Sequence, residues 1–142
     1  MFKLFLLSVV WYSFIQITEP KVLEQVTEGL REGQGVWVAG DLSDSYENQV
    51  LSLMGLPVRG RSVEGYRHLF QQFGLKVEYV EIKREMYQFP TLEELRTWIK
   101  TQVDDLSFVE PYLAAMQQIG CVQLEDGTIA FPTKHVIAYI HK

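Results

Sequence analysis

The segment from Thr18 to Asp41 constrains the fold more than any other part of the chain, because it predicts a helix followed directly by a buried strand. Thr18 is a good N-cap residue, and Pro20 stands in the first turn, where its missing N–H group costs little. Apolar residues then recur on one helical face, and two glycines end this pattern before the apolar run Val36–Ala39. A helix that leads into a buried strand is typical of a parallel α/β sheet.

Similar patterns predict further elements on both sides of this segment. Leu4–Val10 is a nearly continuous apolar run, which is typical of a strand that is covered on both faces. Ser62 precedes a second amphipathic helix, which Gly74 ends. Lys76–Ile82 follows as a strand, and its charged glutamates place it nearer the edge of the sheet.

Two helices, a hairpin and a strand are predicted in the last part of the chain. Thr91 and Ser107 each stand three positions before a glutamate, so each is predicted to open a helix with a capping box. Asp126-Gly127 lies between two apolar runs and indicates a tight hairpin. The last predicted strand covers His135–Ile140.

The order of these elements favours a single α/β domain. A chain of 142 residues suits one domain, which we place over residues 1–142. Strands alternate with helices in the first part, which indicates parallel strands there, and the last strand is expected to be antiparallel. Residues 83–132, with two helices and the hairpin, are predicted to form an insertion within this domain.

Charge and cysteine content exclude several classes of function. The net charge is −5 and no basic stripe is present, so we expect no nucleic-acid partner. The single cysteine, Cys121, excludes a framework of intrachain disulfides and fits a reducing compartment, which favours a cytoplasmic location. No cysteine and histidine residues have zinc-ligand spacing, so no metal site is predicted.

The apolar N-terminus leaves two interpretations open. Residues 1–17 carry Lys3 before an apolar run, as a signal peptide or an anchor would. No small-residue cleavage pair follows, however, and the run is too short for a membrane span of about 20 apolar residues. We therefore predict a buried strand and no membrane partner, with export of a small secreted protein as the alternative.

Four segments, in their order and spacing, carry a resemblance to a known family. They are Phe2–Ser8, Glu19–Gly33, Ser62–Leu75 and the pair Phe89–Leu95 with Asp126–Ile140. Together they resemble the C-terminal half of a class I S-adenosylmethionine-dependent methyltransferase, and among these the trans-aconitate and small-molecule carboxyl methyltransferases. The resemblance implies a partial Rossmann-like sheet with strands equivalent to 4-5-7-6 of the family.

The same resemblance implies a cofactor whose main binding motifs this sequence lacks. The family binds S-adenosylmethionine at a Gly-rich loop after its first strand, and an acidic residue after the second strand holds the ribose. Neither motif occurs here, and Lys3 replaces the usual aspartate of the fourth strand. We therefore expect a methyltransferase of a small molecule that is inactive alone, binds no cofactor tightly and needs a missing half.

Candidate site residues follow from the rule that ligands lie beyond the carboxyl ends of parallel strands. An aromatic wall, a paired guanidinium clamp for a carboxylate and a hydrogen-bond acceptor are the expected roles. The candidates for substrate binding are Trp11, Tyr12, Asp41, Tyr46, Arg59 and Arg61. Packing is the competing explanation for the aromatic residues, Asp41 also suits a loop cap, and the arginines also suit solvent.

A second class of function competes with the enzyme. A first strand with apolar faces and no neighbour beyond it exposes unpaired backbone groups, which favours pairing with another chain. The chain is then a noncatalytic binding or dimerising module, and a homo-oligomer or a partner chain is expected at the edge of Leu4–Val10.

Overall fold

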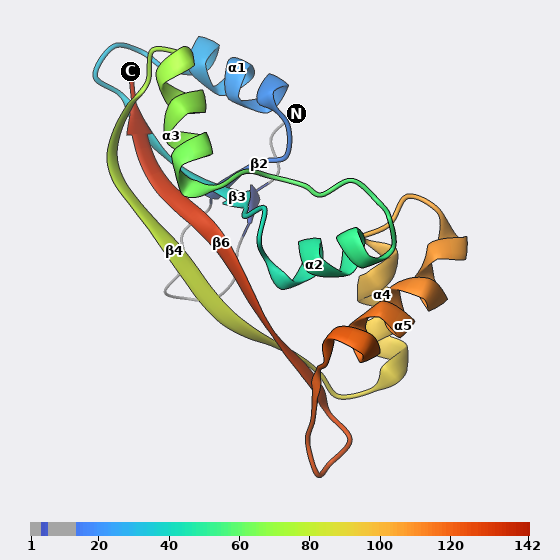
Figure 1. Cartoon of the computed structure of the whole chain (residues 1–142). Helices are drawn as coiled ribbons and strands as arrows, with labels where there is room; N and C mark the ends of the chain where they lie inside the picture. Colours follow the sequence, from blue (N-terminus) through green and yellow to red (C-terminus); the bar gives the residue numbers. More distant parts are fainter. Residues whose placement is uncertain (1–3, 6–13) are drawn as a thin grey trace. The chain divides into compact units, whose positions relative to one another are not determined.

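A computed structural model describes residues 4–5 and 14–142 of the chain (Figure 1). The helices are α1 (Pro20–Gly29), α2 (Tyr46–Leu53), α3 (Val63–Gln72), α4 (Leu92–Lys100), the short 3-10 helix η1 (Leu106–Phe108) and α5 (Val109–Ile119). The strands are β1 (Leu4–Phe5), β2 (Phe14–Ile17), β3 (Gly35–Asp41), β4 (Lys76–Phe89), β5 (Val122–Gln123) and β6 (Ile129–His141). None of the helices in this part of the chain is long and apolar enough to cross a membrane.

The strands form one mixed sheet in the order β1-β2-β3-β6-β4, and β5 pairs with β6. β2 and β3 are parallel, with Ile15 opposite Val38, and α1 connects them in the chain. β6 pairs antiparallel with β3 along all of Gly35–Asp41. Glu78 near the start of β4 lies 3.2 Å from His141 at the end of β6, so these neighbouring strands also run in opposite directions. The predicted mixed α/β class, with parallel strands early and an antiparallel strand last, is confirmed.

The chain divides into two compact units. Unit 1 consists of Met1–Ser43, Arg59–Lys83 and Lys134–Lys142. Unit 2 consists of Asp44–Val58 and Arg84–Thr133. Unit 2 thus contains nearly all of the residues that the sequence predicts as an insertion, and α2 in addition.

The main core of unit 1 lies between two helices and one face of the sheet. Leu23 of α1 and Phe70 of α3 pack with Val38 of β3 and Ile140 of β6, and each is at most 1% exposed. Figure 1 shows α1 and α3 on this face. Leu23 and Phe70 belong to the apolar stripes that the helical periodicity predicts. Burying such a side chain contributes roughly 1.5–3 kcal/mol.

The opposite face of the sheet in unit 1 carries a smaller cluster around Trp37. Successive strand residues point to opposite faces, so Ala39 faces away from the main core and packs with Phe14 and Ile137. The Trp37 ring lies 5.8 Å from Phe14 and 5.2 Å from Tyr139, between ring centroids. Both faces of β3 are therefore apolar, as its continuous apolar sequence predicts.

The order of the predicted elements places the strand Leu4–Val10 beside Val36–Ala39. The parallel neighbour of β3 is β2, so this prediction is wrong. Within the predicted strand, the structure describes only Leu4–Phe5, which pairs antiparallel with β2; residues 6–10 lie outside the described residues. The physical reason is the short link from strand to helix. Only Thr18 and Glu19 separate β2 from α1, and connections of a few residues are usual in such units.

Unit 2 has a core rich in aromatic rings. Phe131 of β6 is fully buried and stacks on Tyr46 at a centroid distance of 4.8 Å. Its ring also lies 5.2 Å from Trp98 of α4 and 5.8 Å from Tyr87 of β4. The aromatic residues bring α2, α4 and β4 around β6, and this packing fixes the position of α2 within unit 2.

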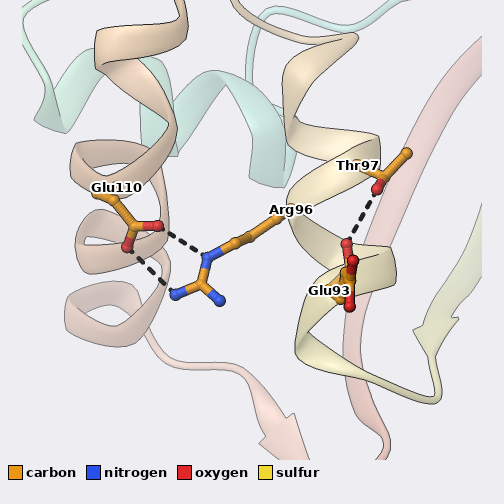
Figure 2. A network of polar contacts seen from close by, with 4 residues as sticks. All are labelled: Glu93, Arg96, Thr97 and Glu110. Carbon is orange, nitrogen blue, oxygen red and sulfur yellow. Dashed lines mark hydrogen bonds and ion pairs between the residues drawn. The ribbon is translucent and has the colours of Figure 1, made fainter.

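A polar contact links two helices of unit 2 at the surface (Figure 2). Arg96 of α4 donates from Nε to Oε1 of Glu110 in α5 at 2.8 Å, and from a terminal nitrogen to Oε2 at 3.5 Å. Thr97 donates its hydroxyl to the carbonyl oxygen of Glu93, 3.0 Å away, within α4. These side chains are exposed, so the apolar core rather than the ion pair holds the two helices together.

The hairpin at Asp126-Gly127 forms with a wider turn than predicted. Gln123 of β5 pairs with Ile129 of β6, which leaves residues 124–128 as the loop. The Thr128 N–H group donates to the Asp126 carboxylate at 2.9 Å, and Gly127 has φ 89°. An Asp-Gly sequence supports turns of several lengths, and here the aspartate bonds the backbone two residues on.

Candidate functional site

The carboxyl end of β3 brings together two of the predicted site residues. Asp41 ends β3, and a parallel bridge then pairs Leu42 with Arg61. The Arg61 N–H group donates to the Asp41 carbonyl oxygen at 3.2 Å, and the Ser43 N–H group donates to the Arg61 carbonyl oxygen at 3.1 Å. The loop that returns from α2 is thus fastened beside the strand end by its backbone.

Gly60 makes this close approach of two backbone segments possible. It has φ 79°, in the left-handed region that residues other than glycine rarely adopt. A Cβ atom at this position would overlap the carbonyl oxygen of Asp41. Glycine therefore fixes where Arg59 and Arg61, on either side of it, leave the backbone.

Tyr66 of α3 also contacts the end of β3. Its ring is 2% exposed, and its hydroxyl donates to the Asp41 carbonyl oxygen at 2.6 Å. Burial raises the pKa of the Tyr66 hydroxyl, and the nearby Asp41 charge raises it further. A Cβ atom at Gly40 would overlap this hydroxyl, so the glycine also admits the tyrosine.

The sequence pattern missed this role of Tyr66. The residue is predicted only as part of the apolar face of its helix, which is correct for the ring. The available signal is that a buried tyrosine hydroxyl requires a hydrogen-bond partner. The pattern does not say where that partner lies, and it is 25 positions away in the sequence.

The side chains at this strand end have complementary chemistry. Asp41 is partly buried, whereas Arg59 and Arg61 are exposed. The charges of Asp41 and Arg61 act in opposite directions on the Tyr66 hydroxyl. The Asp41 charge raises its pKa, and the Arg61 charge lowers it. A carboxylate that accepts hydrogen bonds and guanidinium groups that donate them suit a small polar ligand that itself carries a carboxylate.

Tyr46 has a different environment, in the core of unit 2. It is the first residue of α2 and is 7% exposed. Its hydroxyl donates toward two carbonyl oxygens, that of Gly120 at 3.2 Å and that of Met116 at 3.4 Å. Burial raises the pKa of this hydroxyl as well. These contacts favour a packing role over the predicted contact with substrate.

The two remaining candidates, Trp11 and Tyr12, lie outside the described residues. They were placed in the site because they follow the predicted first strand. The strand that pairs with β3 begins only at Phe14, so the two residues precede it in the chain and do not follow its carboxyl end. The end of this strand is Ile17, and Thr18 and Glu19 occupy the position beyond it.

The turns after the parallel strands do not fit the main S-adenosylmethionine motif of the family. β2 leads to α1 through Thr18 and Glu19, and β3 leads to α2 through residues 42–45. Neither turn contains a glycine. No group of histidine, cysteine, aspartate or glutamate residues suited to a metal ion occurs among residues 4–5 and 14–142.

The fold defines an α/β protein with a mixed sheet in the order β1-β2-β3-β6-β4. No protein-family model matches the chain, and no curated protein matches it either. Among solved structures, the chain is similar to the crystal structure of a Bacillus halodurans protein that is provisionally named as a methyltransferase. The TM-score is 0.51 at 9% sequence identity, and the match covers 85% of this chain and 62% of that one. The likeness shows a methyltransferase type of fold.

Proposed function

We propose that this chain is the substrate-side part of a methyltransferase that uses S-adenosylmethionine and acts on a small molecule. The observation that carries the proposal is the sheet order β2-β3-β6-β4, with β2 and β3 parallel and β6 antiparallel to β3. This order corresponds to strands 4-5-7-6 of the family that the sequence resembles when β2, and not Phe2–Ser8, takes the place of strand 4. The structural likeness to the Bacillus halodurans protein supports a methyltransferase type of fold.

The proposed substrate is a small carboxylic acid bound at the end of β3. In open α/β sheets, ligands bind beyond the carboxyl ends of the strands. Arg61 and Arg59 offer guanidinium donors there, and Asp41 offers an acceptor. A carboxylate substrate would be held through paired N–H donors of one guanidinium group, which fix its orientation as well as its charge.

The proposed cofactor is S-adenosylmethionine, by resemblance to the family. The described turns lack the family's glycine-rich motif, so we propose that this chain by itself does not bind the cofactor and is inactive alone. The cofactor-binding part would come from residues outside this sequence, in the same protein or in another chain. The role of the present residues is then to bind and orient the substrate and to exclude water.

Isothermal titration calorimetry of the 142-residue chain tests both parts of the proposal. We expect no detectable heat with S-adenosylmethionine, and weak binding of trans-aconitate with a Kd of about 1 mM. Arg61→Gln should weaken trans-aconitate binding by about tenfold, because one charge-assisted contact is lost. Arg67→Gln is the matched control, since Arg67 lies on α3 and is 3.5 Å from Glu64.

Two results would contradict the proposal separately. Micromolar affinity for S-adenosylmethionine would show that the chain holds the cofactor by itself. Unchanged trans-aconitate binding in Arg61→Gln, or no binding by the parent chain, would remove the substrate site from the end of β3.

A further inference from the structure

β4 lies at one edge of the sheet and is unusually long. It has 14 residues, and in the part of the chain that the structure describes its sheet neighbour is β6 alone. Figure 1 shows it along the outer side of β6. A strand at a sheet edge presents a row of unpaired N–H and C=O groups, which is a template for pairing with another chain.

The edge strand also exposes apolar side chains along its length. Tyr79 is 45% exposed, Ile82 is 40% exposed and Met86 is 51% exposed. Average strands have about five or six residues, so the exposed edge of β4 is more than twice as long as an average strand. Charged residues of both signs alternate with these apolar ones, and their order decides which partner fits.

A second copy of β4 fits this edge in one register. Two copies related by a two-fold axis perpendicular to the sheet pair antiparallel, with one residue opposite itself on the axis. When Ile82 lies on the axis, Glu81 of each copy stands opposite Lys83 of the other. This register therefore forms two ion pairs and buries the two Ile82 side chains between them.

The neighbouring registers place like charges opposite each other. With Glu81, Lys83 or Arg84 on the axis, that charged residue meets its own copy. With Val80 on the axis, Lys76 of each copy meets Arg84 of the other. Like charges directly opposite destabilise a strand pair, and they offset the Glu78–Arg84 pairs of the Glu81 register. With Tyr79 or Met86 on the axis, no charged residues meet at all. The register centred on Ile82 is thus the one that forms ion pairs over a long overlap without like charges opposite.

We infer that β4 is an interface between two copies of this chain, which pair antiparallel through their edges about Ile82. Glu81 is already oriented on the strand, because the Tyr79 hydroxyl donates to its carboxylate at 2.6 Å. The inference is independent of the proposed enzymatic function, and it concerns the opposite edge of the sheet from the predicted pairing at Leu4–Val10.

Sedimentation of the full chain with charge-swapped variants tests the interface. At low ionic strength and protein concentrations of about 1–200 μM, we expect a reversible dimer with a Kd in the micromolar range. Lys83→Glu and Glu81→Lys should each raise the Kd by about tenfold or more, because each sets like charges opposite at two places. The double variant should restore the parent Kd to within about threefold, because both pairs return with their signs exchanged.

Mixing provides a second readout that a change in folding would not imitate. Equimolar Lys83→Glu and Glu81→Lys chains should form a heterodimer, since the signs are complementary between the two. Lys21→Glu makes the same charge change on the exposed side of α1 and should leave the Kd unchanged. Circular dichroism checks that every variant is folded.

Three results would overturn the inference. One is a parent chain that stays monomeric throughout the concentration range. Another is association that persists unchanged in both single variants, which would assign it to another surface such as the edge at Leu4–Val10. The third is failure of the double variant and of the mixture to associate while both remain folded.

Discussion

One carbonyl group organises the candidate site at the scale of single residues. The Asp41 carbonyl oxygen accepts from the Arg61 N–H group at 3.2 Å and from the Tyr66 hydroxyl at 2.6 Å. Both lone pairs of the oxygen are therefore used, and the two donors come from a loop and a helix. The strand end is therefore held by backbone groups and by the Tyr66 hydroxyl.

Gly60→Ala should destabilise the chain more than a typical surface substitution. The added Cβ atom meets the Asp41 carbonyl oxygen and also forces alanine into a φ of 79°. We expect the free energy of unfolding to fall by about 3 kcal/mol. Urea denaturation followed by circular dichroism measures this change.

Gly55→Ala separates the two causes. Gly55 has φ 74° but no atom within 4 Å of an added Cβ, so only the backbone strain remains. This variant should lose about 1 kcal/mol. Equal losses for Gly55→Ala and Gly60→Ala would show that the approach of Gly60 to Asp41 contributes nothing.

The stability of the chain should decrease above pH 10 in a way that depends on Tyr66. An unfolded tyrosine loses its proton near pH 10, whereas burial and Asp41 raise the pKa of Tyr66 in the folded state. Below pH 10 both states hold the proton and the contribution is fully present; above it the unfolded state releases the proton first, and stability falls. Urea denaturation between pH 8 and pH 11 should give a shallower fall for Tyr66→Phe than for the parent.

The hydrogen bond itself gives a control for that titration. At pH 7, Tyr66→Phe should lower the free energy of unfolding by about 1 kcal/mol, because the Asp41 carbonyl keeps the Arg61 donor. If the parent and Tyr66→Phe had the same slope above pH 10, the hydroxyl would not be held protonated by the fold.

At the scale of elements, the helix starts divide into two groups. Ser62 caps α3 by accepting from the Gly65 N–H group at 3.0 Å, and Thr91 caps α4 in the same way, as predicted. The predictions for Thr18 and Ser107 are wrong. The N-cap of α1 is Glu19, without a side-chain bond, and the N-cap of α5 is Phe108.

The two failures have a common cause in the preceding element. β2 continues to Ile17, and the extended backbone still includes Glu19. The helix therefore begins at Pro20, and Glu19 stands at the N-cap in place of Thr18. The 3-10 turn η1 runs directly into α5, and Asp105 accepts from the Ser107 N–H group at 2.8 Å. A capping sequence identifies good capping residues, but the chain before it decides which residue is used.

Ser62→Ala and Ser107→Ala should therefore differ, although the sequence treats them alike. Ser62→Ala removes a cap and should lower the free energy of unfolding by about 1 kcal/mol. Ser107→Ala should change it by less than about 0.5 kcal/mol, because the Ser107 side chain caps neither η1 nor α5. Urea denaturation of both variants measures the difference, and equal losses would contradict the assignment of the caps.

At the scale of the whole molecule, the proposed function depends on the sheet order, and the proposed association depends on the sheet edges. The antiparallel β6 lies between β3 and β4, so β4 is left at one edge. With a net charge of −5, two copies repel each other weakly at long range, and only a specific arrangement of charges at the edge overcomes this. The proposed dimer at β4 and the proposed substrate site at Asp41 are therefore tested by different substitutions.

The sequence predicts that Asp41 and Arg61 lie close together, as the structure shows, but it does not predict the surroundings of Tyr46. Asp41 and Arg61 follow from the rule on strand ends, because that rule depends on the order of elements along the chain. The core environment of Tyr46 does not follow from the sequence, because an aromatic residue after a strand has the same local pattern in a pocket and in a core. Burial decides between these, and burial depends on partners such as Phe131, far away in the sequence.

The sequence by itself determined the apolar helix faces, the α/β class and the caps at Ser62 and Thr91, because these depend on backbone preferences and on the period of neighbouring residues. Tertiary structure alone decided that β2 is the strand beside β3, and that Tyr66 bonds Asp41. It also decided that the Lys142 ammonium group donates to the carbonyl oxygens of Thr27 in α1 and of its C-cap Leu30, at 3.2 Å and 3.3 Å. Such contacts join segments that are distant along the chain, so only the packing of the whole sheet and its helices can choose among the possible partners.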